Sequence, residues 1–209
     1  MMKIDKVAAQ PDRVGRFKVT FEDGSIMRLY KQTVQDFSVY AGRELSTDEM
    51  DALQDAAETM SAKMRAVRIV AASSVSKKEL QHRLIQKGEK SEKAKEAVQW
   101  LEKLDIVDDG KAAETIVQKC IHKGYGIARA KQALYEKKIP KEYWEQALAD
   151  YPDQTDSIVS YLEAHLDEAN DPKKLRKLID ALLRRGHNYN QIRNALERVI
   201  ADIDDLPEG

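Results

Sequence analysis

Several kinds of residue and segment are scarce in this chain, and each scarcity excludes a class of protein. The 209 residues include one cysteine, Cys120, so no disulfide can form within the chain and a reducing cytoplasm is expected. The longest apolar runs are about four residues, far short of the roughly 20 that cross a membrane. No apolar segment near the N-terminus indicates a signal peptide. With only nine glycines and five prolines, the composition favours a mostly helical protein.

The sequence also lacks the arrangements by which enzymes and metalloproteins are usually identified. Its four histidines stand at spacings that are not typical of metal ligands, either among themselves or with Cys120. Gly124-Tyr125-Gly126 is too short for a nucleotide-binding loop and suits a helix end instead. Asp108 and Asp109 precede a predicted helix, where capping is the favoured interpretation and a metal pair the alternative. We therefore expect a protein that is not an enzyme and has no cofactor or metal.

Positive charge is concentrated in the middle of the chain, although the whole sequence has a net charge of only −1. Residues 60–148 hold 19 basic and 12 acidic residues, whereas residues 1–59 and 149–209 have net charges of −3 and −5. A positive segment between acidic flanks suggests a surface for a polyanion or an acidic protein. From charge alone, lysines that merely solvate helix faces are the simpler interpretation.

The start of the chain favours a small β-rich segment. Lys3–Gln10 is a predicted strand, and Arg16–Phe21 alternates polar and apolar residues, which is typical of a half-buried strand. Asp23-Gly24 predicts a two-residue hairpin turn, because both residues tolerate positive φ. Ser25–Tyr30 is then the returning strand. We expect these three strands to pack on the helix that follows.

A long helix is predicted after a short helix at Lys31–Tyr40 and a loop at residues 41–45. Ser46 followed by Glu49 is a capping-box pattern, which marks a helix N-terminus. From there to Ala72, apolar residues recur at three- and four-residue steps without a helix breaker. The pattern therefore predicts one continuous helix that leads into the rest of the chain.

Three copies of one pattern follow, with helix ends at Gly88, Lys138 and Gly186, separated by 50 and 48 residues. Apolar residues occupy matching positions around each of these ends. Leucines stand four residues before the ends and alanines nine residues after them: Leu84, Leu134 and Leu182, and Ala97, Ala147 and Ala195. The chain is therefore predicted to contain three helix-turn-helix-like units of three helices each.

The helix boundaries can be predicted for each copy. They are Met60–Ala72, Lys77–Gln86 and Glu92–Lys103 in the first, Lys111–His122, Ile127–Lys137 and Lys141–Ala149 in the second, and Asp156–Ala169, Leu175–Arg184 and Gln191–Ile203 in the third. The expected fold is mainly α, with tandem three-helix repeats in an elongated curved array after the β-rich segment. The expected divisions are 1–45, 46–104, 105–152, 153–203 and an acidic tail at 204–209.

Basic residues recur with the repeats. Lys87, Lys137 and Arg185 each stand just before the end of the second helix of a copy. Lysines and arginines neutralise phosphates, and a periodic basic track suits a helical polyanion or a helical protein filament. Tyr125, at a turn, is either a stacking contact or a packing residue. The candidate filament- or DNA-binding residues are Lys77, Lys78, Arg83, Lys87, Lys123, Tyr125, Arg129, Lys131, Lys137, Lys138, Arg176, Lys177, Arg184 and Arg185.

Several of these segments resemble the RecX family of recombination regulators. Ser76–Gly88 resembles the first repeat of that family, and Val107–Leu148, with its Lys123-Gly-Tyr-Gly126 turn, resembles the second. Arg185–Leu196 resembles the third, and the β-rich start resembles the longer members. The resemblance covers nearly the whole chain, and its most specific part is the second copy.

The sequence departs from the family pattern at three places. Ala71–Val75 stands where the family often has arginines, and Ala112-Ala113 stands in place of an aromatic residue. Lys138 replaces a glycine. These departures bear on individual partner contacts more than on the fold.

The resemblance implies a regulator of RecA that is not an enzyme. Such a protein binds along the RecA filament on single-stranded DNA and mostly inhibits its ATPase, strand-exchange and coprotease activities, in recombination, DNA repair and the SOS response. It implies a cytoplasmic monomer without a membrane partner, and it allows weak direct binding to nucleic acid.

Two alternatives stay open on the residues alone. One is a helix-turn-helix DNA-binding module or transcription factor, for which Asn188, Asn190 and Gln191 are the best candidates to contact base edges. The other is a scaffold whose basic face is only solvated.

Overall fold

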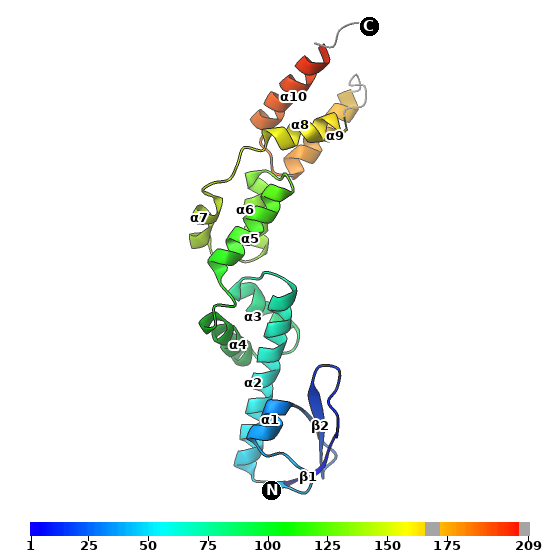
Figure 1. Ribbon diagram of the computed structural model, residues 1–209, viewed down its shortest axis with the longest axis vertical. Helices are drawn as coiled ribbons and strands as arrows, with labels where there is room; N and C mark the ends of the chain where they lie inside the picture. The colour runs from blue at the N-terminus through cyan, green and yellow to red at the C-terminus, as the bar shows by residue number, and fades with distance from the viewer. Residues whose placement is uncertain (166–171, 205–209) are drawn as a thin grey trace. The chain divides into compact units, whose positions relative to one another are not determined.

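The computed structural model describes residues 1–165 and 172–204 (Figure 1). It is mainly helical with an N-terminal antiparallel sheet, as the sequence predicted. The chain divides into two compact units. The first unit consists of Met1–Ser73 and Glu79–Val107, and the second of Ser74–Lys78 and Asp108–Gly209.

The sheet of the first unit contains a strand that was missed. Strands β1 (Met2–Val7), β2 (Arg16–Phe21) and β3 (Ile26–Tyr30) lie where strands were expected, in the order β3-β2-β1-β4. The fourth strand, β4 (Glu44–Leu45), pairs with β1 through Met2 and Lys3. The prediction of a loop at residues 41–45 is therefore wrong at its end. Two residues are too few to show the period-2 alternation by which a strand is recognised.

The connection between β2 and β3 also differs from the prediction. The Phe21 amide donates to the Ser25 carbonyl at 2.9 Å, so the loop has three residues, and Gly24 has φ +81° while Asp23 does not have a positive φ. The Asp23 carboxylate accepts a hydrogen bond from the Ser25 amide at 2.8 Å. This local bond stabilises the turn. Because the loop consists of residues 22–24, the prediction of a two-residue hairpin turn at Asp23-Gly24 is wrong.

The sheet packs on α1 (Lys31–Asp36) and on the N-terminal half of α2 (Thr47–Ala72), as Figure 1 shows. Helix α1 is shorter than the predicted Lys31–Tyr40, since the chain turns at Ser38, which has φ +45°. The predicted capping box of α2 is confirmed: the Glu49 amide donates to Ser46 Oγ at 3.1 Å, and the Ser46 amide donates to Glu49 Oε2 at 2.8 Å. The shared core consists of Ile4, Val19, Phe21, Leu29, Val39, Leu45 and Leu53.

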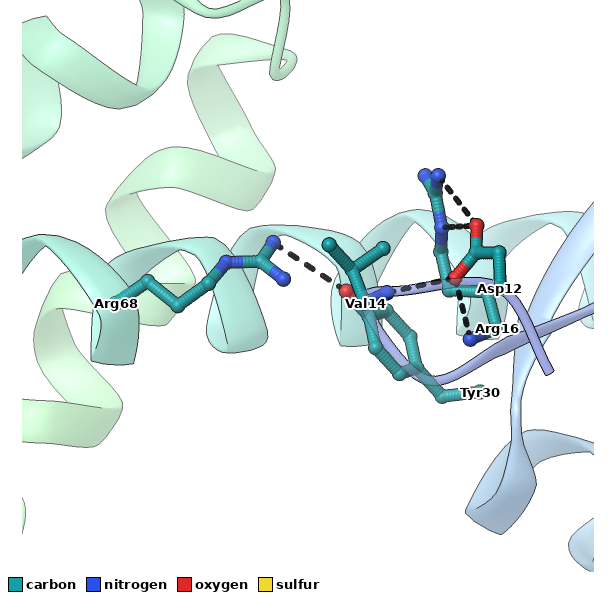
Figure 2. A network of polar contacts seen from close by, with 5 residues as sticks. All are labelled: Asp12, Val14, Arg16, Tyr30 and Arg68. Atoms are coloured by element: carbon teal, nitrogen blue, oxygen red, sulfur yellow. Dashed lines mark hydrogen bonds and ion pairs between the residues drawn. The ribbon is translucent and has the colours of Figure 1, made fainter.

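Helices α3 (Lys77–Gln86) and α4 (Ser91–Lys103) follow the predicted boundaries within one residue. The predicted apolar stripe is buried, with Leu84, Ala94 and Leu101 fully inaccessible to solvent. An ion pair of 2.7 Å between Lys93 Nζ and Asp55 Oδ1 joins α4 to α2. Figure 2 shows a second polar link in this unit, in which the Arg68 side chain of α2 reaches the Tyr30 hydroxyl of β3.

The second unit contains two further groups of helices. They are α5 (Asp109–His122), α6 (Ile127–Glu136), the 3₁₀ turn η1 (Lys141–Tyr143) and α7 (Trp144–Leu148), followed by α8 (Thr155–Glu163), α9 (Pro172–Arg184) and α10 (Tyr189–Asp204).

Three helices of the second unit are not as predicted, and one of them, α9, begins at Pro172 rather than at Leu175. The helix predicted at Lys141–Ala149 begins as a 3₁₀ turn, in which the Tyr143 amide donates to the Pro140 carbonyl. The prediction Asp156–Ala169 is too long on the described residues, because α8 ends at Glu163. Its last residues lie outside the described residues, as does the end of the predicted acidic tail.

The three second helices end in the same way, at the positions where helix ends were predicted. Gly88, Lys138 and Gly186 all have positive φ, of 90°, 55° and 86°. The carbonyls of the matching buried leucines accept hydrogen bonds from the residue after each turn: Leu84 from Glu89 at 3.1 Å, Leu134 from Ile139 at 3.0 Å and Leu182 from His187 at 3.2 Å. This is the Schellman arrangement, which satisfies carbonyls that a helix end would leave unpaired.

A backbone contact between the start of α6 and the end of α9 joins the two halves of the second unit. The Gly126 amide donates to the Arg185 carbonyl at 2.9 Å. A Cβ atom on Gly126 would lie 2.0 Å from the Gly186 oxygen, and one on Gly186 would lie 2.2 Å from the Arg129 amide nitrogen. Both positions therefore require glycine for space as well as for conformation. We refer to this contact as the glycine joint.

A related contact occurs one repeat earlier. Ser76, which occupies the position of Gly126 in its own repeat, donates from Oγ to the Lys137 carbonyl at 2.7 Å. Lys137 in turn occupies the position of Arg185. Each contact thus connects the residue before a second helix to the last carbonyl of the next second helix, but only the later contact is made backbone to backbone.

Replacing Gly126 by alanine tests the glycine joint. The added Cβ overlaps the Gly186 carbonyl, so we expect the second unit to lose about 2–3 kcal/mol, as in an overpacked core. Urea unfolding followed by Trp144 fluorescence in a Trp100→Phe background reports on this unit. Gly88→Ala, which lies in the first unit and is followed through Trp100 in a Trp144→Phe background, is the control, since no atom lies within 4 Å of its added Cβ and only the backbone strain remains. That strain costs about 1 kcal/mol. Equal losses for the two variants would contradict the steric argument.

Lys138→Gly should stabilise the second unit. Lys138 holds φ +55° at the position that the other two repeats give to glycine. Removing the side chain relieves about 1–2 kcal/mol of strain, offset by about 0.5–1 kcal/mol for the freer unfolded chain, for a net gain of about 0.5–1 kcal/mol. Lys137→Gly is the matched control, because Lys137 has φ −83° and gains nothing from glycine. The same urea titration measures both, and a lower midpoint for Lys138→Gly would refute the prediction.

Candidate anion-binding surface

Four of the candidate residues meet in one depression beside the glycine joint. Tyr125 and Arg129, at the start of α6, and Arg184 and Arg185, at the end of α9, line a hollow of about 240 Å³ together with Ala181. We call it the joint pocket. Sequence reasoning had selected all four polar residues, but their proximity arises from the contact between Gly126 and Gly186, which no sequence pattern indicated.

The side chains of the joint pocket are positioned by specific contacts. Arg129 Nη1 lies 3.1 Å from Glu136 Oε1, and the Arg185 guanidinium lies over the Tyr161 ring at 4.3 Å from its centroid. Hydrogen bonds from Gln132 and Arg129 hold the pKa of Glu136 below its ordinary value, so Glu136 is ionised at neutral pH. Arg184 is exposed at the rim. The pocket therefore presents three positive charges, one of which faces a carboxylate.

Tyr125 is fixed through its backbone. Its carbonyl accepts a hydrogen bond of 2.7 Å from the Tyr151 hydroxyl, and burial raises the pKa of Tyr151 to about 12. Tyr125 itself is half-buried and lines the pocket. It thus lines the pocket, and a stacking contact with a bound base stays a prediction.

His187 forms a further hydrogen bond close to the glycine joint. It is 4% exposed, and its Nε2–H donates to the Gly124 carbonyl over 3.1 Å. Burial lowers the pKa of this imidazole, and the charge of Arg185 lowers it further, so His187 is neutral at pH 7. The hydrogen bond is another direct link between α9 and the turn before α6.

A second basic depression lies in the first unit, between the C-terminal half of α2 and α3. We call it the α2–α3 pocket. Its volume is about 400 Å³, and its lining residues are Arg65, Arg68, Ile69, Ala72, Ser73, Arg83 and Lys87. Arg83 and Lys87 were candidates from the sequence, but Arg65 and Arg68 were missed. A signal for them was available in the sequence. They stand three residues apart near the end of the helix that precedes the one containing Arg83, so they lie on the same helix face.

The other candidates lie outside these two pockets. Lys78, Lys123, Lys131, Arg176 and Lys177 are exposed. The Lys77 amide donates to Asp109 Oδ1 at 2.8 Å, Lys137 contributes its carbonyl to Ser76, and Lys138 forms the left-handed turn. The structure thus gathers six of the fourteen candidates, in two groups.

The paired aspartates are helix caps. Asp108 Oδ1 accepts from the Lys111 amide at 3.0 Å and caps α5, as the favoured interpretation held. Asp109 is buried and caps a different helix, α3, through Lys77. Among the described residues, no group of three or more His, Cys, Asp or Glu side chains is placed to hold a metal ion. Cys120 is a buried free thiol whose pKa is raised by burial.

One repeated apolar position was also missed. Ile85, Tyr135 and Leu183 stand three residues before the turns of the three second helices and are 42%, 69% and 43% exposed. The helix end does not require an apolar residue there, since α4 has the exposed Glu102 at the same place before its Asp105 turn. Repetition of the spacing, checked for exposed rather than buried positions, could have found it.

The residues offered for base contact in a helix-turn-helix protein are engaged in another way. The Gln191 amide donates to Asn188 Oδ1 at 2.8 Å, and the Asn188 amide donates to Gln191 Oε1 at 3.2 Å. These reciprocal bonds form a capping box at the start of α10. Two of the three side chains on which that interpretation depended therefore stabilise a helix start.

No helix within residues 1–165 and 172–204 is long and apolar enough to span a membrane.

Comparisons with known proteins identify relatives along nearly the whole chain. No family model matches. A "Regulatory protein RecX" from Vibrio parahaemolyticus is 27% identical over 143 residues, covering 67% of this chain and 92% of the relative. One from Clostridioides difficile is 24% identical over 203 residues, covering 94% and 95%.

Two solved structures have the same fold. A crystal structure of regulatory protein RecX aligns with a TM-score of 0.61 and 19% identity over 93% of this chain and all of that one. The structure of RecX from Lactobacillus salivarius aligns with a TM-score of 0.58 and 22% identity, covering 69% of this chain and 97% of that one.

The stability of the second unit should decrease at acidic pH because of His187. Its pKa in the folded protein lies below the ordinary 6.5, so the unfolded chain binds the proton more readily. Stability is therefore fully present above about pH 6.5 and falls as the pH drops below it. Urea midpoints followed by Trp144 fluorescence between about pH 5 and pH 8 measure the effect. In His187→Gln this part of the pH dependence should vanish, whereas in His122→Gln, which alters an exposed histidine, it should persist.

Proposed function

Because the chain belongs to the RecX family of regulatory proteins, we propose that it binds the filament that RecA forms on single-stranded DNA and inhibits its activities. The inhibited activities are the ATPase, strand exchange and coprotease functions of recombination and DNA repair. The protein acts by binding, as a monomer in the cytoplasm, and it needs no cofactor.

The observation that carries this proposal is the joint pocket. Arg129, Arg184 and Arg185 surround one hollow, and a half-buried tyrosine lies beside them. Guanidinium groups bind phosphate oxygens in a directional way, and an aromatic ring offers a stacking surface to an unpaired base. A filament on single-stranded DNA presents both groups along its groove.

The repeated apolar position supports a partner that is partly protein. Ile85, Tyr135 and Leu183 are exposed at matching places, near the basic residue that precedes each turn. Branched aliphatic side chains gain little from a phosphate backbone but gain free energy when a protein surface buries them. Apolar and basic residues that recur together suit a filament made of repeated protein subunits and DNA.

The helix-turn-helix alternative has less support. A helix that contacts base edges in the major groove must present free polar side chains near its N-terminus. In α10 the side chains of Asn188 and Gln191 are held in the capping box instead. The filament proposal needs no such contact, because charge and stacking are independent of sequence.

Arg184→Glu tests the proposal on RecA ATPase activity with single-stranded DNA. Arg184 is exposed, so its reversal leaves the fold intact. We expect the wild-type protein to inhibit at stoichiometric amounts and the variant to require about tenfold more, which corresponds to about 1.4 kcal/mol. Lys141→Glu, an equal charge change at an exposed position of the same unit, should inhibit like the wild type.

The possible results separate the proposals. A wild-type protein that leaves the ATPase of confirmed filaments unchanged would refute the function. Normal inhibition by Arg184→Glu would show that the joint pocket is not the contact. Equal weakening by both variants would mean that the basic face acts only through its overall charge.

A further inference from the structure

The α2–α3 pocket is the strongest feature that the proposed function leaves unexplained. It gathers four cationic side chains, Arg65, Arg68, Arg83 and Lys87, around one hollow. All of them belong to the first unit, whereas the joint pocket belongs to the second. The two pockets share no residue, so the role of one pocket does not follow from the role of the other.

Two of the four cations are held in place by carboxylates. Arg65 Nε lies 2.8 Å from Glu89 Oε1, and its Nη1 donates to the Lys87 carbonyl at 2.6 Å. Arg83 Nη2 lies 2.6 Å from Glu79 Oε1, and its Nη1 donates to Ser73 Oγ at 3.3 Å. These arginines are oriented and largely neutralised. They form a fixed wall whose remaining N–H groups are preorganised.

The other two cations carry the excess charge. Within the described ranges, the Arg68 guanidinium makes one long hydrogen bond, of 3.4 Å, to the Tyr30 hydroxyl. Figure 2 shows this side chain stretched from α2 toward Tyr30, beyond which Asp12 and Arg16 pair with each other. Lys87 is exposed. Four cations facing two carboxylates leave the pocket with a net charge of +2.

Stabilisation of helix ends explains only part of this cluster. Cations at a helix C-terminus bind its last carbonyls and offset its dipole, and Arg65 does this for α3 through the Lys87 carbonyl. Arg68 is directed to a hydroxyl on the sheet instead. An exposed arginine without a carboxylate, beside a second exposed cation, adds repulsion unless an anion occupies the hollow.

The remaining lining indicates what the anion is attached to. Ile69 and Ala72 supply an apolar surface, and Ser73 supplies a hydroxyl. The volume of about 400 Å³ exceeds what a bare inorganic anion fills and lies in the range of small-molecule sites. Cations on one side and an apolar surface on another fit a phosphate group joined to a sugar and base.

We propose that the α2–α3 pocket binds the phosphate group of a nucleotide unit directly, with Arg68 and Lys87 as the principal contacts. The phosphate can belong to a single DNA strand or to a free nucleoside triphosphate, and both sources offer the same chemistry. The isolated protein binds the phosphate through this pocket, so the binding requires neither a RecA filament nor the joint pocket.

Fluorescence anisotropy of a labelled oligothymidylate with the full-length protein tests this site. The double variant Arg68→Glu/Lys87→Glu should bind at least tenfold more weakly. For this variant, the slope of log K against the logarithm of the salt concentration should be less steep by about 1.4, since each phosphate neutralised on a single strand contributes about 0.7. The matched control is Lys95→Glu/Lys103→Glu, which makes the same charge change at exposed positions of α4 in the same unit. It should bind within about threefold of the wild type and keep the slope.

A second arm identifies the source of the phosphate. ATP added to the wild-type complex displaces the oligonucleotide at submillimolar concentration if the pocket takes free nucleotides, and has no effect there if it takes the strand. Either result supports the site, provided that the Arg68→Glu/Lys87→Glu variant shows the defect and retains the wild-type circular dichroism.

Three results would overturn the inference: no binding of either probe by the wild type, unchanged binding by the double variant, or an equal loss in the α4 control. Inhibition of RecA is measured separately, so its absence would refute the proposed function and leave this site standing. Conversely, if the wild type inhibits RecA and the Arg68→Glu/Lys87→Glu variant binds oligothymidylate as well as the wild type does, only the site is refuted.

Discussion

The arrangement of the second unit depends on one close approach of backbone to backbone. The Gly126 amide bonds to the Arg185 carbonyl, and neither Gly126 nor Gly186 leaves room for a side chain. The composition of the joint pocket follows from that contact. It sets Arg129 beside Arg185, places His187 under the Gly124 carbonyl, and leaves Tyr125 at the edge of the hollow. A cluster of three arginines and a tyrosine thus arises from a requirement for small residues.

The two basic pockets illustrate different ways to hold positive charge. In the joint pocket, an aromatic ring and one carboxylate orient the arginines, and the charge is shared between α6 and α9. In the α2–α3 pocket, two arginines are each tied to a glutamate, and the excess resides on neighbours that lack one. Ion pairs of this kind contribute little to stability when exposed. Their effect here is to fix where unpaired N–H groups point.

Sequence periodicity predicted the repeats because the same local turn ends each second helix. Leu84, Leu134 and Leu182 could be recognised from spacing alone, and so could most helix boundaries. The sites were harder. Arg184 and Tyr125 were chosen as separate basic and aromatic residues, and only the fold shows that they share a hollow. Arg65 and Arg68 were missed because basic residues were compared around the ends of the second helices, whereas these two lie in the first helix of their copy. The strand at Glu44–Leu45 was missed because its partner, β1, lies forty residues away in the chain.

The hydrogen bond that caps α3 has a consequence for the order in which the protein folds during synthesis. The amide of Lys77 is satisfied by Asp109, which follows it by 32 residues, and Ser74–Lys78 accordingly groups with the second unit. While the chain is being synthesised, this hydrogen bond cannot form until the ribosome has released the start of α5. The hydrogen bond that caps α3 is therefore completed only after a later part of the chain has been made.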